Sequence, residues 1–545
     1  MSFRQSRVSR RDILKASAVA AAGAAAFSFG GVARGSSPYG GHFSPHADAL
    51  EETSIAELQA RMDAGTLTSR QLVGMYLERI HALDKNGPML NSILELNPDA
   101  LQIATQLDQE RAAGNVRGPL HGIPIAIKDN IDTDDRMNTR AGSLALVDSR
   151  PLQDATVSAK LREAGAIIIA KAGLSEWANF RGNNSSSGWS AVGGQVRNPY
   201  IIDRNPCGSS SGSGTAPSAS LVAAALGTET DGSIVCPSNN CGLVGIKPTV
   251  GLTSRAGVVP ISHTQDTIGP MARTVADAAA VLSAIVGPDD RDEATADAQN
   301  ISEDYTEFLN PDGLSGARIG VARELFGFSQ EADRVMAGAL QAMADAGATI
   351  VDPVELPNLA DINASGAEFQ VLLYEFAPDL ANYFAGRTAN SPQTLADIVA
   401  FNNAHSGVEL KWFGQELMEI AVTLPGLDDP AYLEFLEISR DGSREQLNAA
   451  LDGNELDALI APTGSPAWPI DLINGDHFLG GSSSPAARAG YPLVSLPAGY
   501  VYGLPVGITF MGRAWDEGTL ISLASGFEAA TQVRQAPHFL STHNY

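Results

Sequence analysis

Cysteine is scarce in this chain of 545 residues, which contains only Cys207, Cys236 and Cys241. Three cysteines cannot all pair, so no framework of disulfides holds the fold together. We expect Cys207 and Cys236 to be small buried packing residues, although a bridge between Cys236 and Cys241 stays open for an exported chain. The sequence also lacks CxxC, HExxH and EF-hand patterns, so neither a metal site nor a cofactor is predicted.

Positive charge is scarce as well. The chain has 36 Lys and Arg against 62 Asp and Glu, which gives a net charge of −26. An acidic surface repels phosphate backbones, so nucleic acid is not expected as a partner. Beyond the N-terminal region, no stretch is long and apolar enough to span a bilayer. With 44% hydrophobic and 18% charged residues, the composition is typical of a globular protein with a large core.

The N-terminal region has its own pattern, in which SRRDILK (9–15) precedes the weakly apolar run ASAVAAAGAAAFSFGGVA (16–33). Paired arginines followed by a modestly hydrophobic segment and small residues are typical of a twin-arginine export signal. We expect residues 1–35 to direct export to the periplasm or the medium and to be removed, without stable membrane association afterwards. Residues 36–52 read as a flexible leader. An N-terminal helix of the fold and a membrane anchor are the alternatives.

The rest of the chain alternates helical and strand patterns. Isoleucines at alternate positions in HGIPIAIKDNI (121–131) predict a strand with Lys128 at its end. Similar apolar strands and helices recur to the C-terminus, where a last helix is expected over 517–531, while residues 360–450 predict a helical insertion. This alternation predicts a single α/β domain over 53–545, built on a sheet covered by helices on both faces.

Two serine-rich segments, CGSSSGSG (207–214) and GTETDGSIVCPSNNCG (227–242), bracket an apolar stretch expected to be helical over 217–226. Loops at the two ends of a buried helix can meet at one site. A serine hydroxyl is a poor nucleophile and needs a base. A buried lysine with a lowered pKa can serve, and Lys128 at the tip of its apolar strand fits that role.

Three segments in this order resemble the amidase signature family: GIPIAIKDNI (122–131), RNPCGSSSGSG (204–214) and GTETDGSIVCPSNNCGLVGIKPT (227–249). The resemblance runs from about Ser54 to Phe539, and the peptide amidase branch is the most similar. It implies the family's α/β fold, in which helices cover both faces of a central twisted mixed β-sheet, and it implies an amide hydrolase. Carried over by position, Ser233 would be the acylating nucleophile, Ser209 a bridging serine in a cis peptide bond, and Lys128 the base.

The resemblance also implies an oxyanion hole made by backbone N–H groups of Thr230, Asp231, Gly232 and Ser233. The family commonly has glycine where Asp231 stands, so we expect this side chain to point away from an oxyanion or to pair with a donor. Many members have arginine at the place of Val235, where it binds an acidic substrate. Valine there predicts a neutral carboxamide as substrate, most simply the C-terminal amide of a short peptide.

The walls of the substrate cleft are less defined by the sequence. Val235, Trp189 and Phe180 are predicted to contact substrate, and Trp189 and Phe180 fit the core equally well.

Other functions compete with this interpretation. GSSSG (208–212) also fits the elbow of α/β-hydrolases with Ser210 as nucleophile, but that elbow needs a strand directly before it, and YIIDRNPC is a poor strand. Within the family, a broad aliphatic or aryl amidase, an esterase and an ammonia-supplying amidotransferase subunit are alternatives. An inactive exported binding protein on the same scaffold is the alternative outside enzymes.

Overall fold

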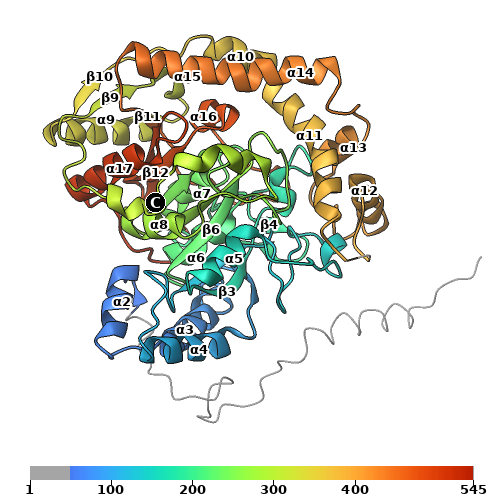
Figure 1. Cartoon of the computed structure of the whole chain (residues 1–545). Coiled ribbons are helices and arrows are strands. Elements are labelled where there is room, and N and C mark those ends of the chain that lie inside the picture. The colour runs from blue at the N-terminus through green and yellow to red at the C-terminus, as the bar shows by residue number, and fades with distance from the viewer. Residues whose placement is uncertain (1–49, 389, 544–545) are drawn as a thin grey trace, which may run out of the picture. The chain divides into compact units, whose positions relative to one another are not determined.

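An eleven-stranded mixed β-sheet runs through the computed structural model, which describes residues 50–388 and 390–543 (Figure 1). The strands in spatial order are β1 (Ile93–Leu96), β3 (Ile167–Ala172), β2 (Pro124–Lys128), β6 (Ala224–Glu229), β8 (Thr267–Ala272), β7 (Val244–Lys247), β12 (Leu493–Val501), β13 (Leu504–Met511), β11 (Ala458–Pro462), β9 (Arg318–Val321) and β10 (Thr349–Val351). A separate hairpin pairs β4 (Trp189–Ser190) with β5 (Gly194–Gln195).

The strand directions make the sheet mixed, as predicted. Strand β2 runs parallel to β3 on one side and to β6 on the other. Strand β9 likewise runs parallel to both β11 and β10. From β6 through β8, β7, β12 and β13 to β11 each pair is antiparallel, and so is the edge pair of β1 and β3. Every residue of β2 and β3 is buried, which explains their near-continuous apolar sequences and places Lys128 inside the protein.

Helices flank the sheet. Those outside the region 359–453 are α2 (Ile55–Asp63), α3 (Ser69–Arg79), α4 (Ala100–Ala112), α5 (Thr156–Glu163), α6 (Ser211–Ser218), α7 (Val235–Cys241), α8 (Val275–Ser283), α9 (Gln330–Asp345), α16 (Ser484–Ala489) and α17 (Glu517–Thr531). Helix α2 begins with the capping box that its sequence indicates, because Ser54 and Glu57 bond each other's backbone N–H. The last helix has the predicted bounds.

Two parts of the secondary-structure prediction are wrong. The helix expected over 217–226 instead covers 211–218, and Ala224 begins strand β6. Strand β6 is buried between β2 and β8, and this tertiary environment overrides the helical preference of its alanines. The segment 235–241, which the sequence suggested to be a loop, is helix α7. Both serine segments therefore lead directly into helices, with Ser209 before α6 and Ser233 before α7.

The predicted helical insertion is present as the helices α10 (Leu359–Ser365), α11 (Ala367–Phe384), α12 (Leu395–Ala404), α13 (Glu416–Ala421), α14 (Pro430–Leu436) and α15 (Gly442–Gly453). In Figure 1, α10, α14 and α15 lie along the top and α11, α12 and α13 along the right side. Leu372 and Phe376 of α11 pack against Phe180 and Ile261 in one hydrophobic cluster. This cluster brings the insertion to the side of the serine loops.

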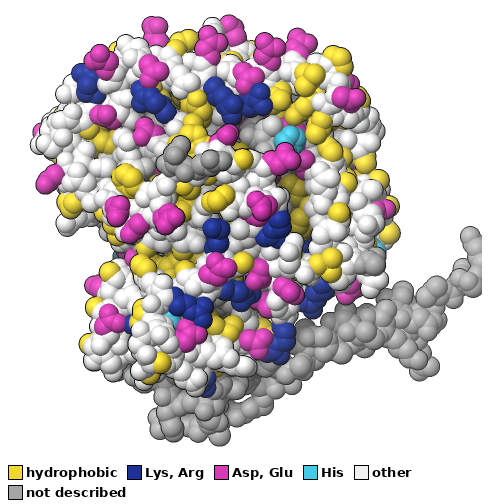
Figure 2. All heavy atoms as spheres, viewed as in Figure 1, with side chains coloured by type: hydrophobic (Ala, Val, Ile, Leu, Met, Phe, Trp, Pro, Cys, Tyr) yellow, Lys and Arg dark blue, Asp and Glu magenta, His cyan; other side chains and the backbone are white. Residues whose placement is uncertain are grey.

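The described residues belong to one compact unit. No helix within the described ranges combines the length and the apolar character that a membrane crossing requires. Figure 2 shows Asp and Glu side chains scattered over the face in view and interspersed with Lys and Arg. The predicted export signal and all but residues 50–52 of the leader lie outside the described residues.

Candidate active site

Lys128 lies at the centre of the candidate site and is fully buried. Its Nζ lies 2.8 Å from Ser209 Oγ and 2.8 Å from Thr228 Oγ1, and 3.2 Å from the Thr228 carbonyl oxygen. Burial lowers the pKa of Lys128 to about 7, and the nearby charges of Asp266 and Glu229 limit that fall. Near neutral pH, a neutral amine is therefore available to accept a proton from Ser209.

Ser209 is also completely buried, and the peptide bond that joins it to Gly208 is cis, as the family resemblance implies. A side chain at position 208 would place a Cβ 2.2 Å from Ser175 Oγ, so only glycine fits there. The next residue, Ser210, donates its backbone N–H to the Ser233 carbonyl oxygen at 3.3 Å. The two serine segments are thus joined directly beside Ser209 and Ser233.

Ser233 lines a cavity of about 300 Å³ together with Gly208, Thr230, Asp231 and Gly232. Gly232 has a φ of +82°, a left-handed conformation that glycine adopts without strain and that turns the chain just before Ser233. The structure therefore brings Lys128, Ser209 and the Ser233 loop to one place, although they lie on three separate segments of the sequence.

The Ser233 loop is organised by a buried carboxylate, Glu229. Its Oε1 accepts the N–H of Gly232 at 2.9 Å, and its Oε2 accepts the N–H groups of Ile234 and Val235 at 2.7 and 2.9 Å. Burial raises the pKa of Glu229, while Lys247 and these N–H groups oppose the rise. The Gly232 N–H therefore binds Glu229 in this structure and is not free for an oxyanion, contrary to the prediction. The N–H groups of Thr230, Asp231 and Ser233 remain predicted donors of the oxyanion hole.

Asp231 behaves as its departure from the family pattern suggested, because its carboxylate pairs with donors. Ser483 Oγ donates to Oδ1 at 2.5 Å and Ser484 Oγ donates to Oδ2 at 2.6 Å. Both serines lie at the beginning of α16 and also line the cavity. Asp231 therefore fastens the Ser233 loop to a segment about 250 residues later in the chain.

The cavity contains two of the three predicted substrate contacts. Val235 lines it, whereas Trp189 does not. The Trp189 ring packs edge-on against Phe413 with ring centroids 5.3 Å apart, in the part of the fold where the hairpin meets the insertion. Phe180 lines the cavity, as predicted. An apolar tryptophan near a serine motif gives no sequence signal that separates these two positions.

The remaining cavity wall comes from distant segments that the sequence did not single out. Its apolar part includes Ile261, Leu372, Trp468 and Phe478. Among the described residues, the charged side chains that line it are two carboxylates, Asp231 and Asp476, and no Lys, Arg or His is part of the lining. An anionic group would meet repulsion here without a compensating partner, whereas a neutral or cationic ligand would not.

The cysteine pairing differs from both expectations. Cys207 and Cys236 form a disulfide with their Cα atoms 5.9 Å apart, and Cys241 is free and buried. Cys207 precedes Ser209 by two residues and Cys236 follows Ser233 by three, so the bridge ties the two serine segments together. Both half-cystines line the cavity. The bridge between Cys236 and Cys241 is excluded because Cys236 is already paired.

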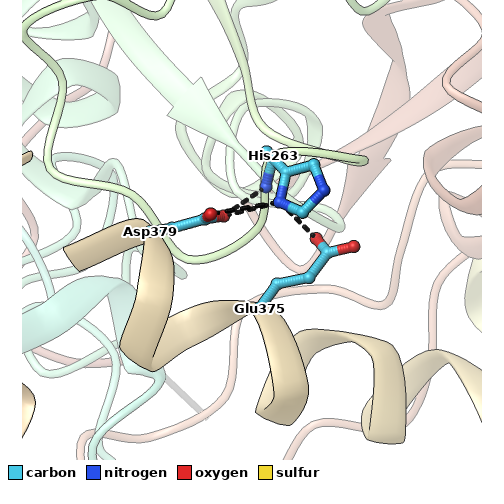
Figure 3. A group of neighbouring side chains, drawn as sticks. All are labelled: His263, Glu375 and Asp379. Carbon is cyan, nitrogen blue, oxygen red and sulfur yellow. Dashed lines mark hydrogen bonds and ion pairs between the residues drawn. The ribbon is translucent and has the colours of Figure 1, made fainter. Parts of the chain in front are cut away.

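A group with metal-ligand spacing lies apart from the serines, on the loop before β8 and on α11. In Figure 3 the His263 ring points toward Asp379 and Glu375, with Nδ1 3.0 Å from Asp379 Oδ2 and 3.5 Å from Glu375 Oε2. Glu375 Oε2 already accepts hydrogen bonds from Ser262 Oγ and from the N–H and Oγ1 of Thr264. These contacts make the group a hydrogen-bonded clamp between the loop and the insertion.

The competing α/β-hydrolase interpretation does not fit this geometry. Ser210 is buried, donates its hydroxyl to the Thr228 carbonyl at 3.0 Å and accepts the Thr228 N–H. The residues before it form only isolated bridges at Ile201 and Arg204, so the required strand is missing from this described segment.

Comparison with known proteins agrees with the fold. The chain matches the Amidase family over residues 71–521. A protein of Arabidopsis thaliana named as a probable amidase is 41% identical over 505 residues, which are 90% of this chain and 93% of that one. The chain therefore belongs to the amidase signature family, and it is an amide-hydrolysing enzyme.

Two solved structures of peptide amidases share the fold closely. The native peptide amidase of Stenotrophomonas maltophilia is 52% identical with a TM-score of 0.84, over 90% of this chain and 99% of that one. A peptide amidase in complex with the competitive inhibitor chymostatin is also 52% identical, with a TM-score of 0.86 over 89% and 99% of the two chains.

The assignment of the nucleophile can be tested by covalent labelling. We expect an active-site-directed fluorophosphonate to label Ser233, and Ser233→Ala to abolish both labelling and turnover, with kcat/KM reduced roughly 10⁴-fold or more. Lys128→Ala should be nearly as severe and Ser209→Ala somewhat milder, because members of one relay are not additive. Mass spectrometry of the labelled peptide identifies the site. A label on Ser210, or full activity of Ser233→Ala, would contradict the assignment.

The pKa of Lys128 predicts the pH dependence. The base must be neutral, so kcat/KM should fall about tenfold per pH unit below a pKa of about 7 and reach a plateau above it. The measurement is kcat/KM for one neutral amide between pH 5 and 10. A rate that climbs without a plateau to pH 10 would show that burial does not lower this pKa.

Proposed function

We propose that this enzyme removes the C-terminal amide of short peptides and releases ammonia, through a relay of Ser233, Ser209 and Lys128. The observation that carries the proposal is the contact of 2.8 Å between Ser209 Oγ and the Nζ of a fully buried lysine beside the Ser233 loop. Among the described residues, no carboxylate is hydrogen-bonded to Lys128 Nζ. This environment suits a lysine that acts as a base better than one that forms a structural ion pair.

In the proposed reaction, neutral Lys128 accepts the Ser209 proton while Ser209 accepts the Ser233 proton. Ser233 Oγ attacks the amide carbon, and the carbonyl oxygen becomes an oxyanion held by backbone N–H groups of the loop. The relay returns a proton to the amide nitrogen, and the carbon–nitrogen bond breaks. Ammonia departs, and the peptide acyl group stays attached to Ser233 as an ester. Water, activated by the same relay, then attacks the ester and yields the peptide carboxylic acid.

The charge of the cavity supports a neutral substrate. Val235 stands where relatives with acidic substrates are expected to hold arginine, and the charged groups that the described part of the chain contributes to the lining are all carboxylates. A terminal carboxamide enters without an unpaired charge, whereas the product carboxylate meets Asp231 and Asp476. This difference favours release of product over its retention. The apolar walls suit an apolar or aromatic side chain on the amidated residue.

A substrate panel tests the proposal. We expect a dipeptide amide to be hydrolysed with a kcat/KM at least about tenfold higher than that of glutamine, because glutamine carries a carboxylate that the cavity does not pair. Ammonia release is measured for both substrates under one set of conditions, alongside a simple aliphatic amide, an anilide and an ester.

Two results would contradict the peptide-amide assignment. A clear preference for glutamine, or for one of the non-peptide substrates, would identify a different member of the family. Absence of hydrolysis throughout, combined with absence of fluorophosphonate labelling, would favour an inactive binding protein.

We also propose that the protein is exported folded by the twin-arginine route. The paired arginines at 10 and 11 and the weakly apolar run after them support export. The bridge between Cys207 and Cys236 supports it independently, because structural disulfides persist in oxidising compartments.

Replacing Arg10 and Arg11 together by lysine tests the export proposal. We expect the variant precursor to stay in the cytoplasm, while the wild-type protein is recovered outside it without the first 35 or so residues. Cell fractionation and N-terminal sequencing provide the measurement. Unchanged export of the lysine variant would exclude the twin-arginine route.

A further inference from the structure

Residues 259–266 form a linking segment between the helical insertion and the Ser233 loop. Ile261 lines the cavity that contains Ser233, whereas His263 and Asp266 line a different cavity of about 350 Å³. Residues close together in one segment therefore face two cavities, so the segment is part of the wall between them. Contacts that fix this segment from outside also fix one side of the active site.

The linking segment holds Thr230, which lies three residues before Ser233. Asp266 Oδ1 accepts the Thr230 hydroxyl at 2.6 Å, and Gln265 Nε2 donates to the Thr230 carbonyl oxygen at 3.3 Å. Thr230 is therefore held by its side chain and by its backbone. Neither Asp266 nor Gln265 lines the cavity with Ser233, so both contact the loop from outside that cavity.

The contact from Gln265 orients a peptide group of the loop. The carbonyl of Thr230 and the N–H of Asp231 belong to one peptide unit, which is planar and trans, so the two groups point in opposite directions. Holding the carbonyl oxygen therefore fixes the direction of the Asp231 N–H, a predicted donor of the oxyanion hole. This N–H donates to no described residue, which leaves it available to an oxyanion.

On its other side, the linking segment is bound to one face of α11. Glu368, Glu375 and Asp379 are separated by seven and four residues, a spacing that places them along one face of a helix. Glu368 Oε1 accepts a hydrogen bond from Gln265 Nε2 at 3.1 Å, and Asp379 Oδ2 accepts the backbone N–H of His263 at 2.7 Å. The amide nitrogen of Gln265 therefore joins α11 to the Ser233 loop.

Glu375, shown in Figure 3, is the most enclosed contact between the linking segment and the insertion. It is completely buried, and its Oε2 accepts the hydroxyl groups of Ser262 and Thr264 at 2.5 and 3.1 Å. Its Oε1 accepts the hydroxyl of Tyr432 on α14 at 2.6 Å. A buried carboxylate needs such donors, so the linking segment and two helices of the insertion are held as one unit.

Asp266 gives the linking segment its shape. Its Oδ2 accepts the backbone N–H groups of Ile261 and Ser262 at 2.8 and 3.0 Å, while its Oδ1 holds Thr230. One carboxylate therefore closes the turn of the segment and connects it to the Ser233 loop. Both oxygens of a carboxylate accept hydrogen bonds, whereas a carboxamide has only one acceptor oxygen.

We propose that the linking segment is a positioning element through which the helical insertion holds the peptide groups at Thr230 and Asp231 in the orientation that an oxyanion requires. Gln265 and Asp266 are the positioning residues. The inference rests on Ser233 as the nucleophile of the proposed function, and it holds for any amide substrate.

Gln265→Met tests the contact to the Thr230 carbonyl, because methionine has a similar length and no donor. With the amide of the substrate panel that the wild-type enzyme hydrolyses fastest, we expect kcat to fall about tenfold while KM stays within about twofold, since the oxyanion forms only in the transition state. The rate constant of fluorophosphonate labelling should fall by a similar factor, because the phosphoryl oxygen also occupies the hole. Asp266→Asn is a second variant of nearly the same size, and we expect the same pattern.

Gln415→Met is the matched control. Gln415 lies directly before α13 in the insertion, is 3% exposed, donates to Asn403 Oδ1 at 3.1 Å and lines neither cavity. This variant loses a buried amide donor, as Gln265→Met does. It should lower the melting temperature but leave kcat and KM within about twofold of wild type, because no contact to the Ser233 loop is lost.

A double variant tests whether the insertion acts through Gln265. Glu375→Gln should lower kcat about fivefold, because the amide of glutamine donates where Ser262 or Tyr432 also donates. If both residues act along one line of contacts, the double variant of Glu375→Gln and Gln265→Met should be no more than about twofold slower than the slower single variant.

Several outcomes would overturn the proposal. It is wrong if Gln265→Met and Asp266→Asn both keep kcat within twofold of wild type, or if either folded variant raises KM and leaves kcat unchanged. It is also wrong if Gln415→Met lowers kcat as much as Gln265→Met does, or if the two reductions multiply in the double variant. Failure of the wild-type enzyme both to hydrolyse any amide and to react with the fluorophosphonate would instead contradict the proposed function.

Discussion

Burial of Lys128 against Ser209 is the interaction on which the rest of the site depends. An ammonium group taken out of water is costly, and the strand that carries Lys128 is enclosed between β3 and β6 with no carboxylate hydrogen-bonded to Nζ. The protein meets that cost by favouring the neutral amine. The neutral amine is then able to accept a proton from the Ser209 hydroxyl at 2.8 Å. Burial therefore both makes the charged lysine costly and provides the neutral base that the chemistry needs.

The loops around this lysine are held by contacts that differ in chemistry but converge on one geometry. The carboxylate of Glu229 gathers three N–H groups of the Ser233 segment, and Asp231 ties the same segment to Ser483 and Ser484. The disulfide between Cys207 and Cys236 joins that segment to the one that carries Ser209. Catalytic groups held in place by such supports lose little freedom on binding substrate.

The sequence predicted the parts of the site that have strong local signals. Alternating isoleucines indicated that Lys128 ends a buried strand, and the ordered motifs of the family identified Ser209 and Ser233. The α/β sheet and the insertion followed from apolar periodicity, and the mixed strand directions followed from the family resemblance. The carboxylate of Asp231 pairs with donors, as its place beside a developing oxyanion required.

Other features depend on contacts between distant segments, which no local pattern encodes. The spacing of three cysteines did not reveal that Cys207 pairs with Cys236. Alanines in 224–226 favour a helix until β2 and β8 enclose them. Leu372, Trp468 and Phe478 reach the cavity from segments more than 130 residues beyond Ser233, so their role appears only in the folded chain.

The most direct test of this account is a titration of Lys128 itself. Lysine labelled with ¹³C at Cε gives resonances whose shifts follow protonation, and the signal absent from Lys128→Met identifies the residue. A midpoint near pH 7 is the result that the account predicts. A midpoint near that of free lysine, about 10.4, would contradict it, because the amine would then be charged throughout the working range of the enzyme.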